Sequence, residues 1–285
     1  MRFSIIVPVY NAAAYLRDCI AALQAQDYPR DDFEILLVDN NSTDGSAAIL
    51  RASEGIRALT ETRQGSYAAR NCGLRAARGD SIAFTDSDCA PDRGWLRAIE
   101  KEFERPATQI VLGCRRPARE DGFLRLVADY ENTKDHYMCS SEDPEMYYGY
   151  TNNMAVRRTT MEAYGPFLER PRGSDTAFVR HVVEGEGRGA VAYARDMRIV
   201  HYEMRNIRTY YKKMFVYARS RRRNGDIIVT RPLSGSERLH LFRETVRRGG
   251  YSLVSSASLG LLLAGGLVAW GMGFHSRIRS GAQPS

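Results

Sequence analysis

The sequence predicts an α/β protein with a mostly parallel sheet that is covered by helices on both faces. Short apolar stretches in the first hundred residues have the β-prone composition of buried strands. Segments with apolar residues at helical spacing separate these stretches. Fully apolar strands that alternate with helices are typical of parallel sheets. With 285 residues, 44% of them hydrophobic, the chain can bury one large core or two modest ones.

Each predicted element follows from a local pattern. Strands are expected at 3–10, 33–39, 56–59 and 81–86. Helices are expected at 13–26, 42–50 and 65–77. The first helix places Leu16, Ile20 and Leu23 on one face, and Ser42 or Thr43 is a candidate cap of the second.

The carboxyl ends of these strands indicate where a ligand would bind. In open parallel sheets, ligands lie in a crevice beyond those ends. Asp39 closes the second strand and Asp86 closes the fourth, so we expect both to face one crevice. Asp86 and Asp88 form an Asp-x-Asp pair, and Asp92 follows shortly after. Two neighbouring carboxylates suit a divalent cation that also binds phosphate oxygens, the usual mode of Mg²⁺ or Mn²⁺. A surface turn uses aspartates as readily, and Asp92 fits a helix cap better than a metal ligand.

The sequence lacks the motifs of several other kinds of binding site. The five cysteines are an odd number without CxxC spacing, which argues against a zinc site or a disulfide framework and fits a reducing compartment. No GxGxxG follows the first strand, and GxxxxGK[ST] is absent. An EF-hand beginning at Asp86 would have Pro91 where glycine is needed and Arg97 where glutamate is needed. The initial apolar run is too short for a signal peptide, so we expect a cytosolic location for most of the chain.

The charge is unevenly distributed. From residue 201 onward there are 15 Lys and Arg against 4 Asp and Glu, whereas residues 1–200 have 26 against 30. A mildly acidic globular part therefore precedes a strongly basic tail. Basic tails bind nucleic acid or anionic lipid.

The C-terminal sequence favours lipid over nucleic acid. Residues 253–274 have no charge and are long enough to cross a hydrocarbon core of ~30 Å. Arginines flank this segment on both sides, with more of them before it, which agrees with a cytosolic N-terminal side. The preceding residues 231–248 combine apolar positions at helical spacing with arginines, as in interfacial amphipathic helices. A buried C-terminal helix or hairpin is the alternative. The prediction is a protein on the cytoplasmic face of the cell membrane that binds no nucleic acid, with crossing or in-plane insertion left open.

Four sequence blocks in this order and spacing resemble family 2 glycosyltransferases, which are inverting enzymes of the GT-A fold. The blocks are SIIVPVYNAAAYL, ILLVDNNSTDGS, AARNCGLRAARGDSIAFTDSDCAPDRGWL and TNNMAVRRTTMEAYGPFLERPRGSDTAFVR. The resemblance covers roughly residues 1–220. It implies a glycosyltransferase domain at 1–225, with a nucleotide-sugar half (1–115) and an acceptor half (116–225). A basic linker (226–250), an apolar segment (251–275) and a tail (276–285) follow.

The resemblance also implies roles for individual residues. Asp88 would bind a divalent cation directly, Asp86 would reach the ribose or the metal shell, and His201 would complete that shell. Asp175 would be the catalytic base, although the acidic residue that usually precedes it in the family is replaced here by Ser174. Nucleotide-sugar contacts would come from Pro8, Tyr10, Asp39, Arg70, Asp86 and Asn153.

Each of these residues also has a structural interpretation. Asp39 and Asp175 could cap helices, His201 could be a structural histidine, and Arg70 could be a solvated helix residue. The aromatic run Tyr147, Tyr148 and Tyr150 could stack on a sugar or belong to an ordinary strand. Asn152 and Asn153 could bond sugar hydroxyls or only the backbone. The run Arg219, Arg221, Arg222 and Arg223 could meet lipid headgroups, an acceptor pyrophosphate, the donor diphosphate or only solvent.

Glycosyl transfer with inversion needs two separate acidic sites. A divalent metal stabilises the diphosphate leaving group, and one carboxylate removes the proton of the acceptor hydroxyl. The predicted function is therefore metal-dependent transfer of a sugar, with UDP the expected carrier, to a lipid-linked or glycan acceptor at the membrane. A catalytically silent nucleotide-sugar-binding scaffold and a sugar nucleotidyltransferase are the alternatives. The sequence leaves the oligomeric state open.

Overall fold

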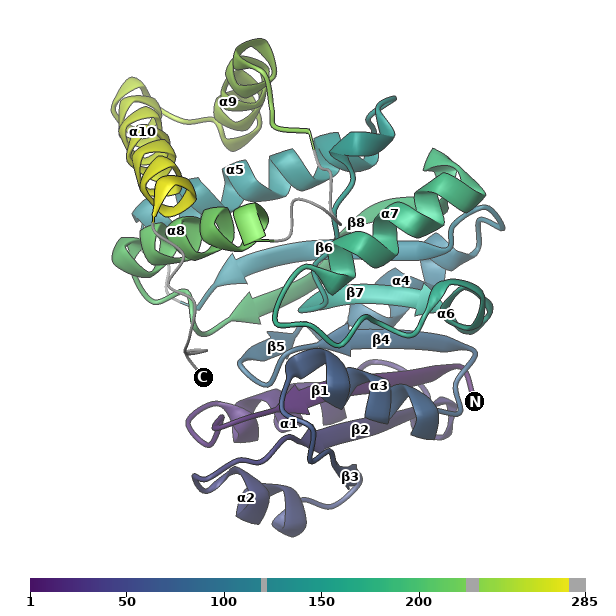
Figure 1. Cartoon of the computed structure of the whole chain (residues 1–285). Coiled ribbons are helices and arrows are strands. Elements are labelled where there is room, and N and C mark those ends of the chain that lie inside the picture. Colours follow the sequence, from purple (N-terminus) through teal and green to yellow (C-terminus); the bar gives the residue numbers. More distant parts are fainter. Residues whose placement is uncertain (119–121, 224–230, 277–285) are drawn as a thin grey trace.

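The computed structural model describes residues 1–118, 122–223 and 231–276, and this part forms an α/β fold around one sheet (Figure 1). The strands in the sheet are ordered β3-β2-β1-β4-β7-β6-β8-β5. Their bounds are Phe3–Val9 (β1), Phe33–Asp39 (β2), Arg57–Thr60 (β3), Ser81–Thr85 (β4), Cys89–Pro91 (β5), Ile110–Pro117 (β6), Asn153–Arg157 (β7) and Val191–His201 (β8).

The sheet is mostly parallel, as predicted, with antiparallel pairings in its second half that make it mixed. β1, β2, β3 and β4 pair in parallel, and so do β6 and β8. β7 lies antiparallel between β4 and β6, and the short β5 pairs antiparallel with β8. The reversal at β7 restores the direction of β6, so the carboxyl ends of β1, β2, β4, β6 and β8 all lie at one edge.

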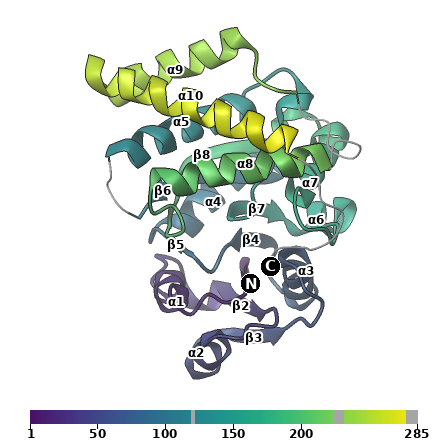
Figure 2. The ribbon, with the colours of Figure 1, turned by 60° about the vertical axis from the view of Figure 1, so that its left-hand side comes forward.

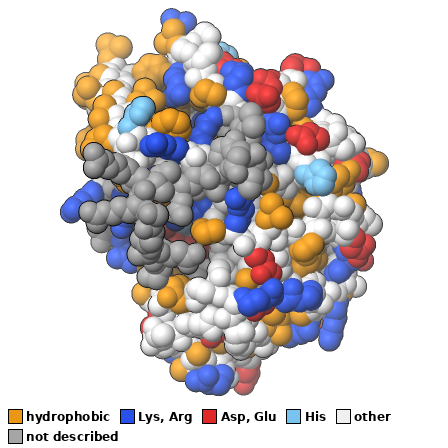
Figure 3. Space-filling view, viewed as in Figure 1, with side chains coloured by type: hydrophobic (Ala, Val, Ile, Leu, Met, Phe, Trp, Pro, Cys, Tyr) orange, Lys and Arg blue, Asp and Glu red, His pale blue; other side chains and the backbone are white. Residues whose placement is uncertain are grey.

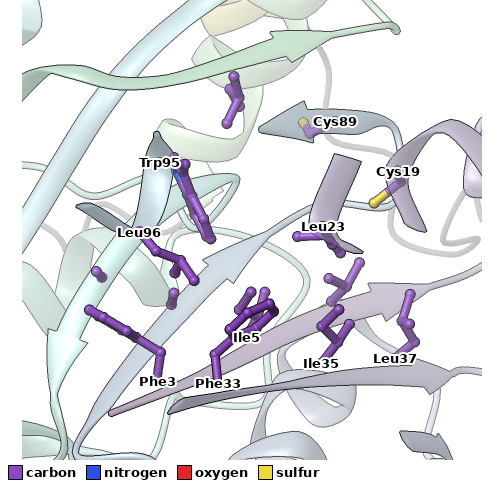
Figure 4. Packing of buried hydrophobic residues seen from close by; sticks show 14 of the residues in the cluster. Phe3, Ile5, Cys19, Leu23, Phe33, Ile35, Leu37, Cys89, Trp95 and Leu96 are labelled. Atoms are coloured by element: carbon purple, nitrogen blue, oxygen red, sulfur yellow. The ribbon is translucent and has the colours of Figure 1, made fainter. Parts of the chain in front are cut away.

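Helices cover both faces of the sheet, as predicted. On one face lie α1 (Leu16–Gln24), α2 (Ser46–Ala52) and α4 (Trp95–Phe103). On the other lie α3 (Ser66–Ala76), α5 (Gly122–Cys139), α6 (Arg158–Tyr164) and α7 (Ser174–Glu186). In β1, Ile5 points to the first core and Ile6 to the second, the period-two alternation of a strand with two buried faces. Figure 4 shows Phe3, Phe33, Leu23 and Trp95 packed in the first core.

The predicted capping of the second helix is wrong. α2 begins at Ser46 after Gly45, and no side chain caps it. Ser42 and Thr43 instead bond Asn11: the Asn11 backbone N–H donates to Ser42 Oγ at 3.1 Å, and the Thr43 N–H donates to Asn11 Oδ1 at 2.8 Å. These bonds join the loops that follow β1 and β2, where the nucleotide-contacting residues were predicted.

Three helices complete the described chain above the sheet (Figure 2). They are α8 (Ile207–Arg223), α9 (Gly235–Gly249) and α10 (Leu253–His275). α9 begins with a capping box in which Ser234 and Glu237 exchange hydrogen bonds. α10 packs along α8 and also touches α5. The expected helices at 231–248 and 253–274 are therefore present, whereas residues 224–230 and 277–285 lie outside the described residues.

α10 is long and apolar enough to cross a membrane, and among the described residues it is the one helix that meets this criterion. Length and composition alone are a weak sign of a membrane span. Much of its apolar surface is exposed, with Leu253 at 91%, Val254 and Leu261 at 76% and Val268 at 64%. Orange side chains gather over this helix at the upper left of Figure 3.

Candidate active site

The shared edge of the sheet brings together acidic and basic residues from distant parts of the sequence. Asp39 ends β2, Asp86 directly follows β4, and His201 ends β8. Arg115 lies near the end of β6. Parallel strands place these ends side by side, which is where ligands bind in open α/β sheets.

Asp88 and His201 form a compact group with Cys89. The antiparallel pairing of β5 with β8 sets Cys89 opposite His201. Asp88 precedes Cys89, and its Oδ2 lies 3.2 Å from His201 Nε2. One potential ligand atom from each of the three residues lies within 4.8 Å of the others.

The donors in this group suit a divalent cation such as manganese or magnesium. Burial opposes ionisation of Asp88, but the hydrogen bond with His201 and the nearby positive charges keep the pKa of Asp88 below its ordinary value. Without a bound metal, burial raises the pKa of the Cys89 thiol well above its ordinary value, which makes this sulfur the weakest of the three candidate ligands. The arrangement thus offers one carboxylate and one imidazole, and a diphosphate and water would complete the shell.

Asp86 is oriented toward Arg70 rather than toward this group. The buried Arg70 forms an ion pair with Asp86 through Nη2, and its guanidinium carbon lies 5.5 Å from the centre of the Tyr67 ring. Burial raises the pKa of Asp86, although Arg70 opposes that effect. Arg70 Nε is buried and has no hydrogen-bond partner among the described residues. Arg70 is therefore a buried site residue and not a solvated one.

Asp175 lies in the first turn of α7, facing the same cavity as Asp86 and Arg70. Its Oδ1 accepts a hydrogen bond from the Thr176 N–H at 2.9 Å, and Oδ2 accepts a long one from the Thr151 N–H at 3.4 Å. Burial raises the pKa of Asp175, and the hydrogen bonds from Tyr67 and Thr176 oppose this only in part. A carboxylate with a raised pKa is a stronger base.

The backbone at Gly149 lies very close to the backbone of Asp175. A Cβ at Gly149 would lie 2.6 Å from the Asp175 carbonyl oxygen, so only glycine fits there. Tyr148 and Tyr150, which flank it, line the cavity, whereas Tyr147 is buried in the core. Tyr148 and Arg115 both contact the buried carboxylate of Asp135.

The residues predicted to contact the nucleotide lie at the ends of β1 and β2. Pro8 is buried in β1, and Tyr10 directly after this strand is 39% exposed. Asp39 does not cap α2, since Gly45 holds that position. Its buried Oδ1 has no hydrogen-bond partner among the described residues, which leaves this oxygen available to a ligand hydroxyl or amide.

Asn153 is not brought to the cavity, and Asn152 is. The fully buried Asn153 side chain accepts a hydrogen bond from Trp95 Nε1 at 2.8 Å and donates to the Cys114 and Met197 carbonyls at 2.9 Å. These bonds satisfy its amide and join β7 to β6 and β8. Asn152 lines the cavity, and its buried Oδ1 has no hydrogen-bond partner among the described residues.

The structure adds two charged residues and corrects one. Lys213 of α8 bonds Glu203 at 2.7 Å near the Asp88–His201 pair, and Arg115 lines the cavity. The apolar residues 110–112 that precede Arg115 in β6 were the available sequence signal for it, whereas Lys213 is one of many cations in the basic tail. Asp92 does not cap α4, because its carboxylate pairs with Arg116 and Gly94 precedes the helix.

Comparison with known proteins identifies the family. The model of "Glycosyl transferase family 2" matches residues 4–165, more than half of the chain. This chain belongs to glycosyl transferase family 2. The glycosyltransferase AglE of Haloferax volcanii is 32% identical over 169 residues, covering 58% of this chain and 55% of AglE. The chain thus spans about half the length of that relative.

Solved structures show the same fold. The mannosyltransferase PcManGT of Pyrobaculum calidifontis, in complex with GDP-Man and Mn²⁺, matches with a TM-score of 0.61 and 23% identity over 97% of this chain and 76% of that one. S. aureus TarS in complex with UDP-GlcNAc matches with a TM-score of 0.57 and 18% identity over 94% of this chain and 81% of that one. The protein is a family 2 glycosyltransferase with a GT-A-like fold, and both of these solved structures hold a nucleotide sugar, one of them together with Mn²⁺.

Proposed function

We propose that this glycosyltransferase catalyses inverting, metal-dependent transfer of a sugar from a nucleotide sugar, with UDP the expected carrier, to a lipid-linked or glycan acceptor at the cytoplasmic face of the membrane. The observation that carries the proposal is the position of two acidic groups at one sheet edge. Asp88 and His201 form a metal-type pair, and Asp175 stands apart from them on α7.

The two groups have distinct tasks in the proposed reaction. Asp88 and His201 would hold the divalent cation, which when bound would stabilise the negative charge of the departing diphosphate. Asp86 and Arg70 orient the ribose and the diphosphate, and Asp39 contacts the nucleoside. Asp175 accepts the proton of the acceptor hydroxyl as its oxygen attacks the anomeric carbon from the opposite face. One displacement inverts the configuration without a covalent intermediate.

Two solved relatives with bound nucleotide sugars support a nucleotide-sugar donor for this chain. TarS and PcManGT were solved with UDP-GlcNAc and with GDP-Man and Mn²⁺, so both carriers are candidates here. Contact with a membrane is supported by the exposed apolar surface of α10 and by the arginines of α9.

Calorimetry tests the donor site directly. We expect one of a panel of UDP-, GDP- and dTDP-sugars to bind more tightly in the presence of Mn²⁺ than in its absence. The Asp88→Ala substitution should abolish this metal-dependent increase in affinity. Asp92→Ala is the matched control, because Asp92 is a nearby carboxylate that pairs with Arg116. Failure of every donor to bind folded protein, or equal loss in both variants, would refute the proposed site.

A further inference from the structure

The cavity that holds Asp175 is also lined by the apolar helix α10. It has a volume of about 680 Å³. Its wall includes Asp86 and Asp175 as well as Leu263, Leu267 and Trp270 of α10. A single cavity thus connects catalytic carboxylates to a hydrophobic surface helix.

Much of the wall of this cavity is basic. Among the described residues that line it, seven are Arg or Lys and three are Asp or Glu. Several of the cations are held by acids, such as Arg115 by Asp135 and Arg231 by Glu237 and Asp143. Arg238 of α9 instead donates Nε to the Leu233 carbonyl at 3.1 Å, and its side chain lines the cavity. Such a wall favours an anion in the cavity.

Leu267 connects the cavity to the outer surface of the molecule. This residue lines the cavity and is 50% exposed, so it belongs to both the cavity wall and the surface of α10. Leu261 is exposed as well but does not line the cavity, and helical spacing places it on a different side of α10. An apolar chain in the cavity could therefore reach the outer surface at Leu267.

We propose that this cavity is the acceptor site and that it binds a glycosylated lipid phosphate or diphosphate. The apolar chain lies along α10, the phosphate lies among Arg238 and the other cations, and a sugar hydroxyl reaches Asp175. The assignment rests on the proposed function and selects the lipid-linked class of acceptor. The acceptor oxygen forms a bond to the anomeric carbon, the bond from that carbon to the diphosphate breaks with its electron pair on the leaving group, and the hydroxyl proton passes to Asp175.

Tryptophan fluorescence provides a test that needs no enzymatic activity. The chain has two tryptophans, of which Trp95 is fully buried in the core and Trp270 lines the cavity. We expect bromo-octyl phosphate, below its critical micelle concentration, to quench Trp270, and Trp270→Phe to abolish the saturable quenching. Affinity should rise about four-fold per methylene along an alkyl phosphate series until the chain outgrows the cavity. Inorganic phosphate has only the charged group and octanol has only the alkyl chain, so each should bind at least tenfold more weakly than octyl phosphate.

Matched substitutions separate the cavity from general surface effects. Arg238→Gln should raise the Kd of octyl phosphate about tenfold, as expected for one charged hydrogen bond, and Arg238→Lys should restore part of the affinity. Arg243→Gln, an exposed change on the same helix outside the lining, should have no effect. Likewise Leu267→Asn should weaken binding and Leu261→Asn should not. Circular dichroism confirms folding, and the milder Leu267→Ala replaces Leu267→Asn if the latter unfolds.

The outcomes distinguish this inference from the proposed function. Quenching that is absent, or equal effects of the lining and control variants, would overturn the acceptor site even if nucleotide sugars bind normally. Equal affinity for inorganic phosphate and octyl phosphate would also overturn it, since the site would then recognise a free anion. Loss of donor binding with intact alkyl phosphate binding would refute the proposed function and leave the lipid site in place.

Discussion

At the scale of single residues, the site depends on carboxylates whose surroundings shift their pKa values in opposite directions. The hydrogen bond with His201 keeps the pKa of Asp88 low against the effect of burial, so this residue stays an anion suited to a metal. Burial raises the pKa of Asp175, which suits proton transfer. A pair of acids separated in this way by their environments is a common basis for distinct catalytic roles.

The pH dependence of transfer should report Asp175. The groups that face it are Tyr67 and Arg70 of α3 and the backbone N–H groups of Thr151 and Thr176. Because Asp175 must be ionised to accept a proton and its pKa lies above 3.8, activity should fall as the pH drops through that raised value. We expect the acid limb of kcat/KM to lie above the range of an ordinary aspartate.

Substitution provides the check on this assignment. Asp175→Asn should lower kcat by a factor of about 10² to 10⁴ and remove the limb, with donor binding unchanged. Glu184→Gln, on the exposed side of the same helix, should leave the profile intact. An unchanged acid limb in Asp175→Asn would show that another group is the base.

The sequence predicted which residues lie at strand ends, but it did not predict which way a side chain points. Asp39 and Asp86 could be placed because each follows a buried strand of predictable direction. Asn152 and Asn153 are equivalent in sequence, and only tertiary packing assigns one to the cavity and the other to Trp95. Cys89 joined the metal-type group through the pairing of β5 with β8, which is a long-range contact that local patterns do not contain.

At the scale of elements, the same limit explains the sheet. Local periodicity predicted β1 to β4 and α1 to α3 but not the short β5, and the position and reversed direction of β7 result from pairing with β4 and β6. Helices at 231–248 and 253–274 were also predictable from spacing and apolarity. The packing of α10 against α8 depends on which of its small residues face α8, and composition alone does not tell them apart.

The close packing of α10 against α8 requires a glycine at position 273. A Cβ at Gly273 would lie 2.2 Å from the Phe215 carbonyl oxygen, whereas nothing lies within 4 Å of a Cβ at Gly271. Gly273→Ala should therefore separate the two helices locally and increase hydrogen exchange in α10. Gly271→Ala should instead slow exchange, because alanine stabilises a helix interior by about 1 kcal/mol relative to glycine. Equal effects of the two variants would show that α10 is not tightly docked.

At the scale of the whole molecule, the docking of α10 restricts how the protein can meet a membrane. α10 runs beside α8 over much of its length: the Tyr211 hydroxyl donates to the Leu262 carbonyl at 3.3 Å, and Arg222 Nη1 donates to the Phe274 carbonyl at 3.0 Å. α8 also contains Lys212, Lys213 and Arg219. A spanning orientation of α10 would draw these cations into the hydrocarbon, at a cost of about 3 kcal/mol for each at the bilayer centre.

α10 should therefore lie in the plane of the membrane surface, with its outward face in the lipid and the acceptor cavity beside it. Fluorophores attached at position 257 or 272, near opposite ends of this exposed face, should be quenched to similar extents by lipids brominated at one depth. A spanning helix would separate the two positions by about 22 Å, because each residue adds 1.5 Å. Steadily increasing depth from position 257 through 264 to 272 would contradict the in-plane orientation. Absence of quenching at all three would contradict membrane contact itself, and the acceptor would then have to reach the cavity from solution.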